Sequence, residues 1–226
     1  MSRSVIFDTE TTGLDPLTGD RVIEIACIEL HRDLPTGATF HILIDPERDI
    51  PEEATRIHGY RRSHLQGKPR FADMVDDFLA FVQDSPLIAH NAPFDFGFIN
   101  AELRRANRAP LDMTRMICTL VLAKTRFPGL PNSLDSLCRR YDIDLTERTS
   151  HNALLDCRLL SDVYVELTGG RQSALILLDD ANGAMPSIAY QPIAGRRPIL
   201  IDLDAATTER HATFIARLKD PVWPTP

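Results

Sequence analysis

Apolar residues fall into short runs along the first fifth of the chain. The runs cover residues 4–8, 21–30 and 38–44, and Gly, Pro and Asp residues lie between them. Runs of this length bounded by turn residues predict strands, and short connections favour antiparallel neighbours. The chain is therefore expected to begin with a three-stranded meander.

The middle of the chain has helical spacing instead. Apolar residues recur every three or four positions over 71–83, and a short strand at 86–89 leads into a helix from about 93 to 106. Further helices are expected near residues 117–126, 133–140 and 151–168. A mixed sheet flanked by helices, the α/β class, fits this order of elements.

The last quarter of the chain loses this regularity. Gly169 and Gly170 are expected to end the preceding helix, because glycine accepts the left-handed conformation of a helix end. Beyond residue 178, Pro, Gly and small residues predict a flexible linker. The expected parts are a main domain at 1–178, a linker at 179–198 and a tail at 199–226.

Composition limits the class of protein. The 226 residues suffice for one full domain and a smaller part. We find no charged-then-apolar leader and no apolar run of about 18 residues, so we expect a soluble, cytoplasmic protein without membrane contact. The cysteines lack Cys-x-x-Cys spacing, which favours reduced thiols over disulfides or a zinc site. They are Cys27, Cys118, Cys138 and Cys157.

The net charge of −7 is unevenly distributed. Residues 171–226 balance six basic with six acidic side chains, so the whole excess lies in residues 1–170. An acidic domain binds polyanions poorly by charge alone. A nucleic-acid substrate would therefore need local, metal-assisted contacts, and a partner to deliver the strand.

Two carboxylates end the first apolar run. Asp8 and Glu10 are two positions apart, and such side chains share one face of a strand. Carboxylates this close repel one another unless a cation lies between them. The pair therefore indicates a site for a hard metal ion where the sheet opens to solvent.

Further acids follow at helix starts. Asp95 lies just inside the helix that follows the strand at 86–89. His151 and Asp156 are five positions apart, which on one continuous helix would point them about 140° apart. We therefore expect His151 on the preceding loop, Asn152 near the cap and Asp156 one turn inside.

Each of these residues also has an ordinary interpretation when taken alone. Asp8 and Glu10 fit a solvated strand end, Asp95 a first-turn charge favoured by the helix dipole, and His151 a loop histidine. Their joint placement at strand ends and helix starts is what favours an active site. Acids that are scattered, or buried against cationic partners with no room for an ion, would refute it.

Three motifs together resemble those of the RNase H-like exonucleases with four acidic residues and a histidine. The motifs are Asp8-x-Glu10, Asp95 and His151-x-x-x-x-Asp156. Within that family, residues 127–140 and 148–170 are similar to the proofreading epsilon subunits of bacterial DNA polymerase III. The resemblance runs from about residue 3 to 178 and returns more faintly at 199–223.

The resemblance implies an RNase H-like mixed five-stranded sheet and a 3′-to-5′ exonuclease. Such an enzyme removes mispaired 3′-terminal nucleotides of DNA as 5′-monophosphates. Hydrolysis of this kind uses two divalent cations about 3.5–4 Å apart, and Mg²⁺ or Mn²⁺ suits oxygen ligands. We assign four metal ligands, Asp8 (bridging), Glu10, Asp95 (partly through water) and Asp156, with His151 as the general base.

Substrate contacts are implied in the same way. Thr11 and Thr12 lie in a turn whose backbone N–H groups can approach a terminal nucleotide, beside Leu14, which matches an apolar wedge next to the last base. The alternative for this segment is a simple β-turn. The other matching positions are Glu10, Glu53, His58, Asn91, Phe94 and Asp156. Their alternatives are a surface charge for Glu53, a helix end for His58 and a core position for Phe94.

The C-terminal part predicts protein partners. Gln172, Leu175 and Leu177 resemble a peptide that binds the sliding clamp, although the two leucines also suit packing on the domain. Within the tail, a strand at 199–203 and a helix at 207–218 capped by Thr207 are expected. Residues 199 to Trp223 resemble the part of such proteins that binds the polymerase alpha subunit, and the alternative is a tail folded on its own domain.

Two rival functions stay open from the sequence. An exoribonuclease or RNA-trimming enzyme of the same superfamily would share every catalytic residue, so the tail distinguishes them. A non-catalytic adaptor between clamp and polymerase would not need a full set of metal ligands. Digestion of frayed 3′ DNA ends with and without a chelator separates the adaptor from both enzymes.

Overall fold

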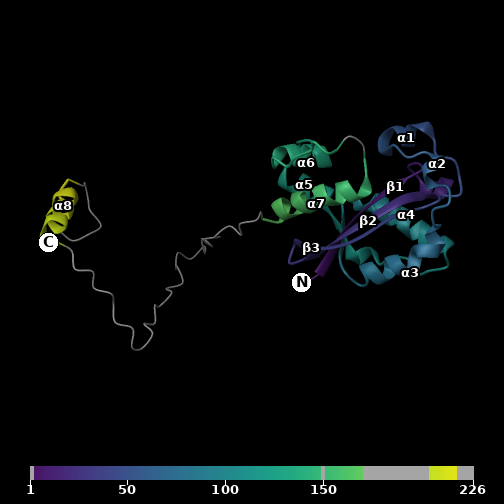
Figure 1. Cartoon of the computed structure of the whole chain (residues 1–226), viewed down its shortest axis with the longest axis horizontal. Helices are drawn as coiled ribbons and strands as arrows, with labels where there is room; N and C mark the ends of the chain where they lie inside the picture. The colour runs from purple at the N-terminus through teal and green to yellow at the C-terminus, as the bar shows by residue number, and fades with distance from the viewer. Residues whose placement is uncertain (1–2, 149–150, 170–203, 218–226) are drawn as a thin grey trace, which may run out of the picture. The chain divides into compact units, whose positions relative to one another are not determined.

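The computed structural model describes residues 3–148, 151–169 and 204–217. The chain divides into two units, residues 1–176 and 177–226, and each is described by itself. In its described residues the first unit holds a five-stranded sheet with helices on both faces (Figure 1).

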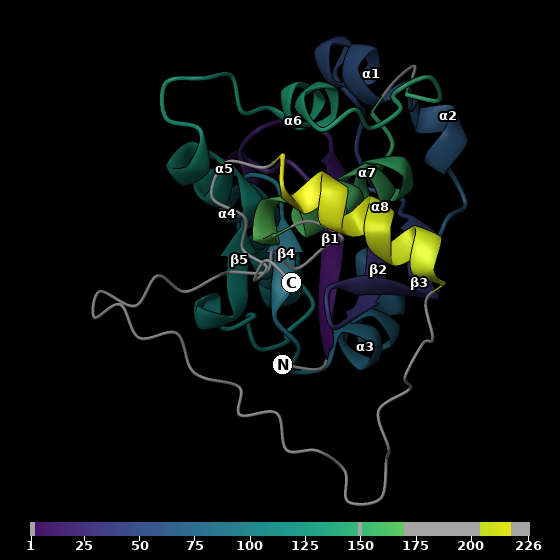
Figure 2. The ribbon, with the colours of Figure 1, turned by 90° about the vertical axis from the view of Figure 1, so that its left-hand side faces the viewer.

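The strands form one mixed sheet in the order β3-β2-β1-β4-β5 (Figure 2). β1, β2 and β3 are antiparallel neighbours, whereas β4 runs parallel to β1 and β5 parallel to β4. The strands are β1 (Arg3–Thr11), β2 (Val22–His31), β3 (Leu34–Leu43), β4 (Leu87–Ala89) and β5 (Met116–Cys118). The predicted meander and the mixed α/β sheet are confirmed.

The pattern of apolar residues did not identify β5. Met116–Cys118 pairs with β4, and α5 starts only at Thr119, although a helix was expected from about residue 117. Three residues are too few to establish an alternation of their own, so their apolar side chains were assigned to the helix that follows.

The other helices predicted in this unit agree with the structure to within two residues at each end. The helices of this unit are α1 (Glu52–His58), α2 (Arg62–Leu65), α3 (Phe71–Val82), α4 (Ala92–Arg105), α5 (Thr119–Arg126), α6 (Leu134–Arg140) and α7 (Ala153–Thr168). Gly169 caps α7 with φ 137°, as the Gly-Gly pair predicted.

The two faces of the sheet bury different helices, because side chains alternate along a strand. Val5 and Phe7 of β1 pack with α3 and α4, and Ile6 packs with α5, α6 and α7. Figure 1 shows α3 and α7 on opposite sides of the sheet. Asp8 and Glu10 continue the Ile6 face, so they project from β1 on the side that α7 covers.

The second unit contributes one described helix, α8 (Ala205–Ile215). Its N-cap is Asp204, whose side chain accepts a hydrogen bond from the Thr207 N–H (2.7 Å). The prediction that Thr207 caps the helix was wrong. The helix begins two residues earlier, and Thr207 lies in its first turn, where its N–H is bonded by the Asp204 cap.

Several predicted segments lie outside the described residues. They are the linker, the strand at 199–203 and the partner-binding residues Gln172, Leu175, Leu177 and Trp223. No helix in the described parts of the chain is long and apolar enough to cross a membrane.

Candidate active site

The five motif residues line one cavity of about 390 Å³, here called the acidic cavity. They come from three separate segments: Asp8 and Glu10 from β1, Asp95 from α4, and His151 and Asp156 from the start of α7. The sequence prediction that these residues converge is therefore met in space, while their individual roles stay predictions.

Asp8 and Glu10 share an environment that disfavours their charged forms. Burial raises the pKa of Asp8 well above its usual range, and repulsion from Asp95 and Glu10 adds to it. Burial, followed by repulsion from Glu24 and Asp156, raises the pKa of Glu10 to about 8. Without a cation, these carboxyls hold protons at pH values where an exposed carboxyl would be ionised.

Asp95 lies in the first turn of α4 and is held against β1. Its Oδ1 accepts hydrogen bonds from the Thr9 N–H (3.1 Å) and the Thr9 hydroxyl (2.7 Å). Burial raises the pKa of Asp95 to about 7, even though the bonds from Thr9 act in the opposite direction. Thr9 was not among the predicted site residues.

The start of α7 has the predicted arrangement. Asn152 is the N-cap and accepts a hydrogen bond from the Leu155 N–H (3.1 Å), which leaves His151 on the preceding loop. The His151 N–H donates to the Ile57 carbonyl of α1 (3.1 Å). Ligand atoms of Glu10, His151 and Asp156 lie within 4.8 Å of one another, a spacing that suits one metal ion.

Arg148 is the main residue that the sequence analysis missed. Its Nε donates to Asp156 Oδ1 and its Nη2 to Asp156 Oδ2, both at 2.7 Å. Burial alone would raise the pKa of Asp156, but the hydrogen bonds from Arg148 outweigh it, with His151 nearby acting in the same direction, and lower the pKa. Arg148 is the first residue of the segment 148–170, one of the two segments that carried the family resemblance. Its place in that segment was the only sign in the sequence that it could belong to the site.

Glu24 of β2 was also missed, and it holds the start of α7 in place. Its fully buried carboxylate accepts hydrogen bonds from Asn152 Nδ2 (3.1 Å) and the Ala153 N–H (3.2 Å). It lies 2.7 Å from His41 Nε2. An acid inside a continuous apolar run was the sequence signal, since a buried charge needs partners.

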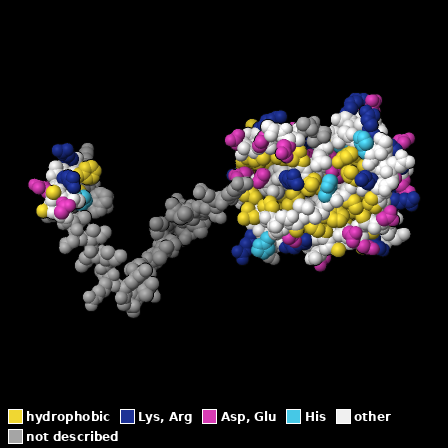
Figure 3. All heavy atoms as spheres, in the orientation of Figure 1, with side chains coloured by type: hydrophobic (Ala, Val, Ile, Leu, Met, Phe, Trp, Pro, Cys, Tyr) yellow, Lys and Arg dark blue, Asp and Glu magenta, His cyan; other side chains and the backbone are white. Residues whose placement is uncertain are grey.

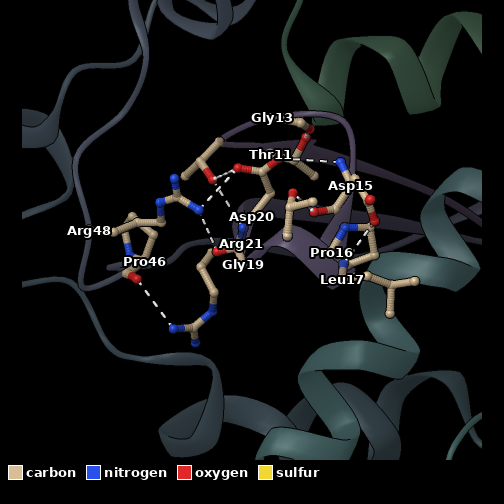
Figure 4. A network of polar contacts seen from close by, with 12 residues as sticks. Thr11, Gly13, Asp15, Pro16, Leu17, Gly19, Asp20, Arg21, Pro46 and Arg48 are labelled. Atoms are coloured by element: carbon tan, nitrogen blue, oxygen red, sulfur yellow. Dashed lines mark hydrogen bonds and ion pairs between the residues drawn. The ribbon is translucent and has the colours of Figure 1, made fainter.

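The loop between β1 and β2, residues 12–21, forms one wall of the acidic cavity and is tied together by polar contacts (Figure 4). Asp20 accepts a hydrogen bond from Arg48 Nη1 (3.0 Å). A Cβ atom at Gly13 would meet the Asp20 carboxylate at 2.1 Å, so only glycine fits there. The loop presents Leu14 to the cavity, and this residue is 81% exposed.

Most of the predicted substrate contacts line the same cavity. These residues are Glu10, Thr11, Thr12, Leu14, Glu53, His58, Phe94 and Asp156. Asn91 does not line it; this residue caps α4 with φ 65° and lines a neighbouring groove with Lys124. Phe94 lines the cavity and its ring also packs on Phe98, with centroids 4.9 Å apart, so its contact with the substrate stays a prediction.

His58 ends α1, as its alternative interpretation had it, and also lines the cavity. Its Nδ1 accepts a hydrogen bond from the Tyr60 N–H (3.0 Å), and the two rings stack. Its Nε2 is buried and has no hydrogen-bond partner among the described residues. Desolvation lowers the pKa of His58, which favours the neutral imidazole.

The acidic cavity suits a divalent cation. Its donors are carboxylate oxygens and one imidazole, the ligand types that hard and borderline divalent ions take. The raised pKa values of Asp8, Glu10 and Asp95 mark three carboxyls without enough positive charge nearby. These three carboxyls are not buried against cationic side chains, as a metal site requires. Asp156 differs, because it forms an ion pair with Arg148.

Charged side chains of both signs are interspersed on the face of the first unit seen in Figure 3. Lys and Arg occur there singly or in small groups among acidic residues, with apolar side chains between them. On this face, contacts that recognise a polyanion would be local.

The order of the five strands, with carboxylates at the end of β1 and in the first turns of α4 and α7, defines an RNase H-like exonuclease. Residues 5–164 match the family model described as Exonuclease (RNase_T). Proteins named DNA polymerase III subunit epsilon match most of the chain. That of Rickettsia typhi is 45% identical over 96% of both chains. That of Escherichia coli K12 is 35% identical over 96% of this chain and 93% of its own.

The chain belongs to this exonuclease family and, within it, to the DNA polymerase III epsilon subunits. It is a 3′-to-5′ exonuclease of the proofreading type, and the exoribonuclease and adaptor alternatives are not favoured.

Two solved structures share the fold. Exonuclease X in complex with 5′ overhanging duplex DNA superposes with a TM-score of 0.57 at 25% identity, covering 73% of this chain and 90% of that one. The zinc-bound complex of E. coli ExoI with single-stranded DNA gives 0.65 at 18% identity, covering 76% of this chain and 41% of that one. This chain thus spans about two fifths of ExoI, and that likeness shows the fold alone.

Proposed function

We propose that this exonuclease works by a two-cation mechanism in the acidic cavity and removes mispaired 3′-terminal nucleotides of DNA as 5′-monophosphates. The observation that carries the proposal is the convergence of Asp8, Glu10, Asp95, Asp156 and His151 on one cavity from three separate segments. Acids that only solvated the surface would have no reason to be buried together without compensating charge.

The four carboxylates would hold Mg²⁺ or Mn²⁺. Asp8 is the best candidate to contact both ions, because it faces Asp95, Glu10 and Asp156. Asp95 keeps one oxygen on Thr9, which suits a ligand that acts partly through water. Bound cations of this kind lower the pKa of a coordinated water and neutralise charge on the attacking and leaving oxygens.

His151 is positioned to take the proton from the attacking water. Imidazole accepts a proton near neutral pH, and the carboxylates beside it would be occupied as ligands. His151 lies on the loop before α7, is about half exposed, and lines the acidic cavity. It can therefore exchange the proton with solvent after each turnover.

The remaining cavity residues would bind the end of the strand. Leu14 would offer an apolar surface to the last base, and His58, which also lines the cavity, would contact the terminal nucleotide. A cavity of about 390 Å³ has the size of one nucleotide-scale ligand and admits a frayed end rather than a duplex. Selectivity for mismatches then follows from easier fraying, without recognition of the wrong base.

We further propose that residues 199–226 bind the polymerase alpha subunit after a linker at 179–198. The support is the match of the chain, over 96% of its length, to relatives named as subunits of DNA polymerase III. Gln172, Leu175 and Leu177 are proposed as a weak contact to the sliding clamp. The cytoplasmic location stays a prediction.

Digestion of a 3′-mispaired primer by the full chain tests the function. We expect 5′-monophosphates as product, faster loss of a mispaired than a paired end, and no digestion in EDTA. Digestion that continues in EDTA would contradict the cation mechanism, and preference for RNA would contradict the substrate. Co-purification with the alpha subunit tests the partner, with a chain truncated after residue 178 as the control.

A further inference from the structure

Arg148 makes contacts in the acidic cluster that the proposed mechanism does not use. Its guanidinium donates to both carboxylate oxygens of Asp156 at 2.7 Å and, through Nη2, to His151 Nδ1 at 3.0 Å. Its Nη1 donates to Asp135 of α6. Only 9% of the side chain is exposed. The structure therefore gives Asp156 a resident positive charge.

This charge is placed where it competes with a metal ion. A guanidinium fork that binds both oxygens of a carboxylate forms one of the strongest pairings between side chains, and it engages the oxygens a cation needs. In the part of the chain that the structure describes, Asp8, Glu10 and Asp95 form no ion pair, so the competition concerns Asp156.

We propose that Arg148 holds Asp156 in place of a divalent cation, and that cation uptake transfers the guanidinium to Asp135. The proposal rests on the proposed function, since it requires the acidic cavity to bind a cation. Asp135 lies in the first turn of α6, is 39% exposed and does not line the cavity. Arg148 already contacts it, so the transfer needs only the Asp156 half of the contact to open.

The same movement frees the proposed general base. Nδ1 of His151 contacts both Arg148 Nη2 (3.0 Å) and Asp156 Oδ2 (3.3 Å). When Arg148 leaves Asp156, its hydrogen bond to the imidazole is lost as well, because one nitrogen, Nη2, makes both contacts. Arg148 is in this sense a positioning residue that couples loading of the site to release of His151.

Mn²⁺ binding to the full chain, measured by calorimetry at one pH, tests the proposal with changes of opposite sign. Arg148→Gln removes the competitor, so the Kd for Mn²⁺ should fall roughly tenfold. Asp135→Asn removes the acceptor of the displaced guanidinium, so the Kd should rise about threefold. Arg139→Gln, an exposed arginine on the same α6, is the matched control and should leave the Kd unchanged.

A Kd that is unchanged or raised in Arg148→Gln would overturn the proposal, because Arg148 would then be a spectator or a support of the loaded site. Circular dichroism checks that each variant folds. If Arg148→Gln does not fold, Arg148→Lys decides, since an ammonium cannot hold both oxygens and should also lower the Kd. Failure of the wild-type chain to bind Mn²⁺ would instead refute the proposed function.

Discussion

The acidic cavity has two unlike sides. On the β1 and α4 side, Asp8, Glu10 and Asp95 form no ion pair within the described residues, and burial raises the pKa of each. On the α7 side, Asp156 is paired with Arg148 and its pKa is lowered. Four acids that look equivalent in a motif are therefore charged differently before any cation arrives.

This difference shows which part of the site depends most on a cation. The β1 and α4 side has no positive charge of its own and relies on protons when no cation is present. On the α7 side, the charge of Asp156 is already balanced by Arg148, so a metal ion would have to replace the guanidinium. The comparison predicts that equal changes on the two sides have unequal effects on stability, even where both abolish activity.

The largest effect is expected from neutralising one acid on each side. Asp8→Asn and Asp156→Asn should each lower kcat by at least about 10³-fold, because several kcal/mol of metal-dependent stabilisation is lost. In EDTA at pH 8, Asp8→Asn should raise Tm by relieving repulsion, whereas Asp156→Asn should lower it by leaving Arg148 short of a partner. Primer digestion and thermal denaturation measure the two. Shifts of Tm with the same sign would break the comparison.

His151→Ala should have the next largest effect. Loss of a general base costs about 10²–10⁴ in kcat. The fold and the Kd for Mn²⁺ should change much less than in the aspartate variants, because His151 is about half exposed. His31→Ala, an exposed histidine at the end of β2, is the control. A His151→Ala enzyme with wild-type kcat would remove His151 from the mechanism.

The pH dependence of stability sharpens the comparison further. The pKa of Glu10 rises from about 4 in an unfolded chain to about 8 in the folded one, and that of Asp95 rises to about 7. Between about pH 4 and pH 8 the folded protein therefore binds more protons than the unfolded chain. The free energy of unfolding falls as the pH rises through this range.

In EDTA, Tm should therefore drop by roughly 5 °C or more between pH 5 and pH 8. Saturating Mn²⁺ should remove most of the drop, since a cation replaces the protons. Glu10→Gln should flatten the curve in EDTA, because the amide does not titrate. A Tm in EDTA that rises with pH over this range would contradict the raised pKa values.

The sequence predicted those elements in which apolar residues recur with the spacing of a strand or a helix. Helices α3, α4 and α7 have enough apolar residues to set a spacing, and their bounds agree to within two residues. The strands of the meander were also found, although β1 ends three residues later and β3 begins four residues earlier than predicted. β5 has three residues and depends on pairing with β4, a contact that local pattern does not contain. α8 is capped by Asp204, an acceptor three positions before the predicted cap Thr207.

The site divides in the same way. Asp8, Glu10, Asp95 and Asp156 were found because hard-metal chemistry requires acids at strand ends and helix starts. Arg148 was not found, because a metal site does not require a positively charged side chain among its ligands. Its role becomes visible only from the contacts of its guanidinium with Asp156. Thr9 holds Asp95, Glu24 holds the start of α7, and Asp20 holds the loop between β1 and β2. These contacts join distant segments, which spacing along the chain does not show.

The smallest expected effect concerns an apolar wall that belongs to neither charged side. Leu14 and Leu17 lie three residues apart on the loop between β1 and β2 and are 81% and 85% exposed, but only Leu14 lines the acidic cavity. If Leu14 packs on the terminal base, Leu14→Ala should raise KM about three- to tenfold and change kcat little, because uniform binding is lost.

Leu17→Ala is the matched control and should leave KM unchanged. Neither substitution should alter the pH dependence of Tm in EDTA, since no charge changes. Steady-state digestion of a frayed 3′ end measures both variants. Equal effects of Leu14→Ala and Leu17→Ala on KM would mean that the loop as a whole contacts DNA, and the cavity would then not define the subsite for the last base. A shift in the pH dependence of Tm would mean that the loop is coupled to the titrating carboxyls, through the contact between Asp20 and Arg48.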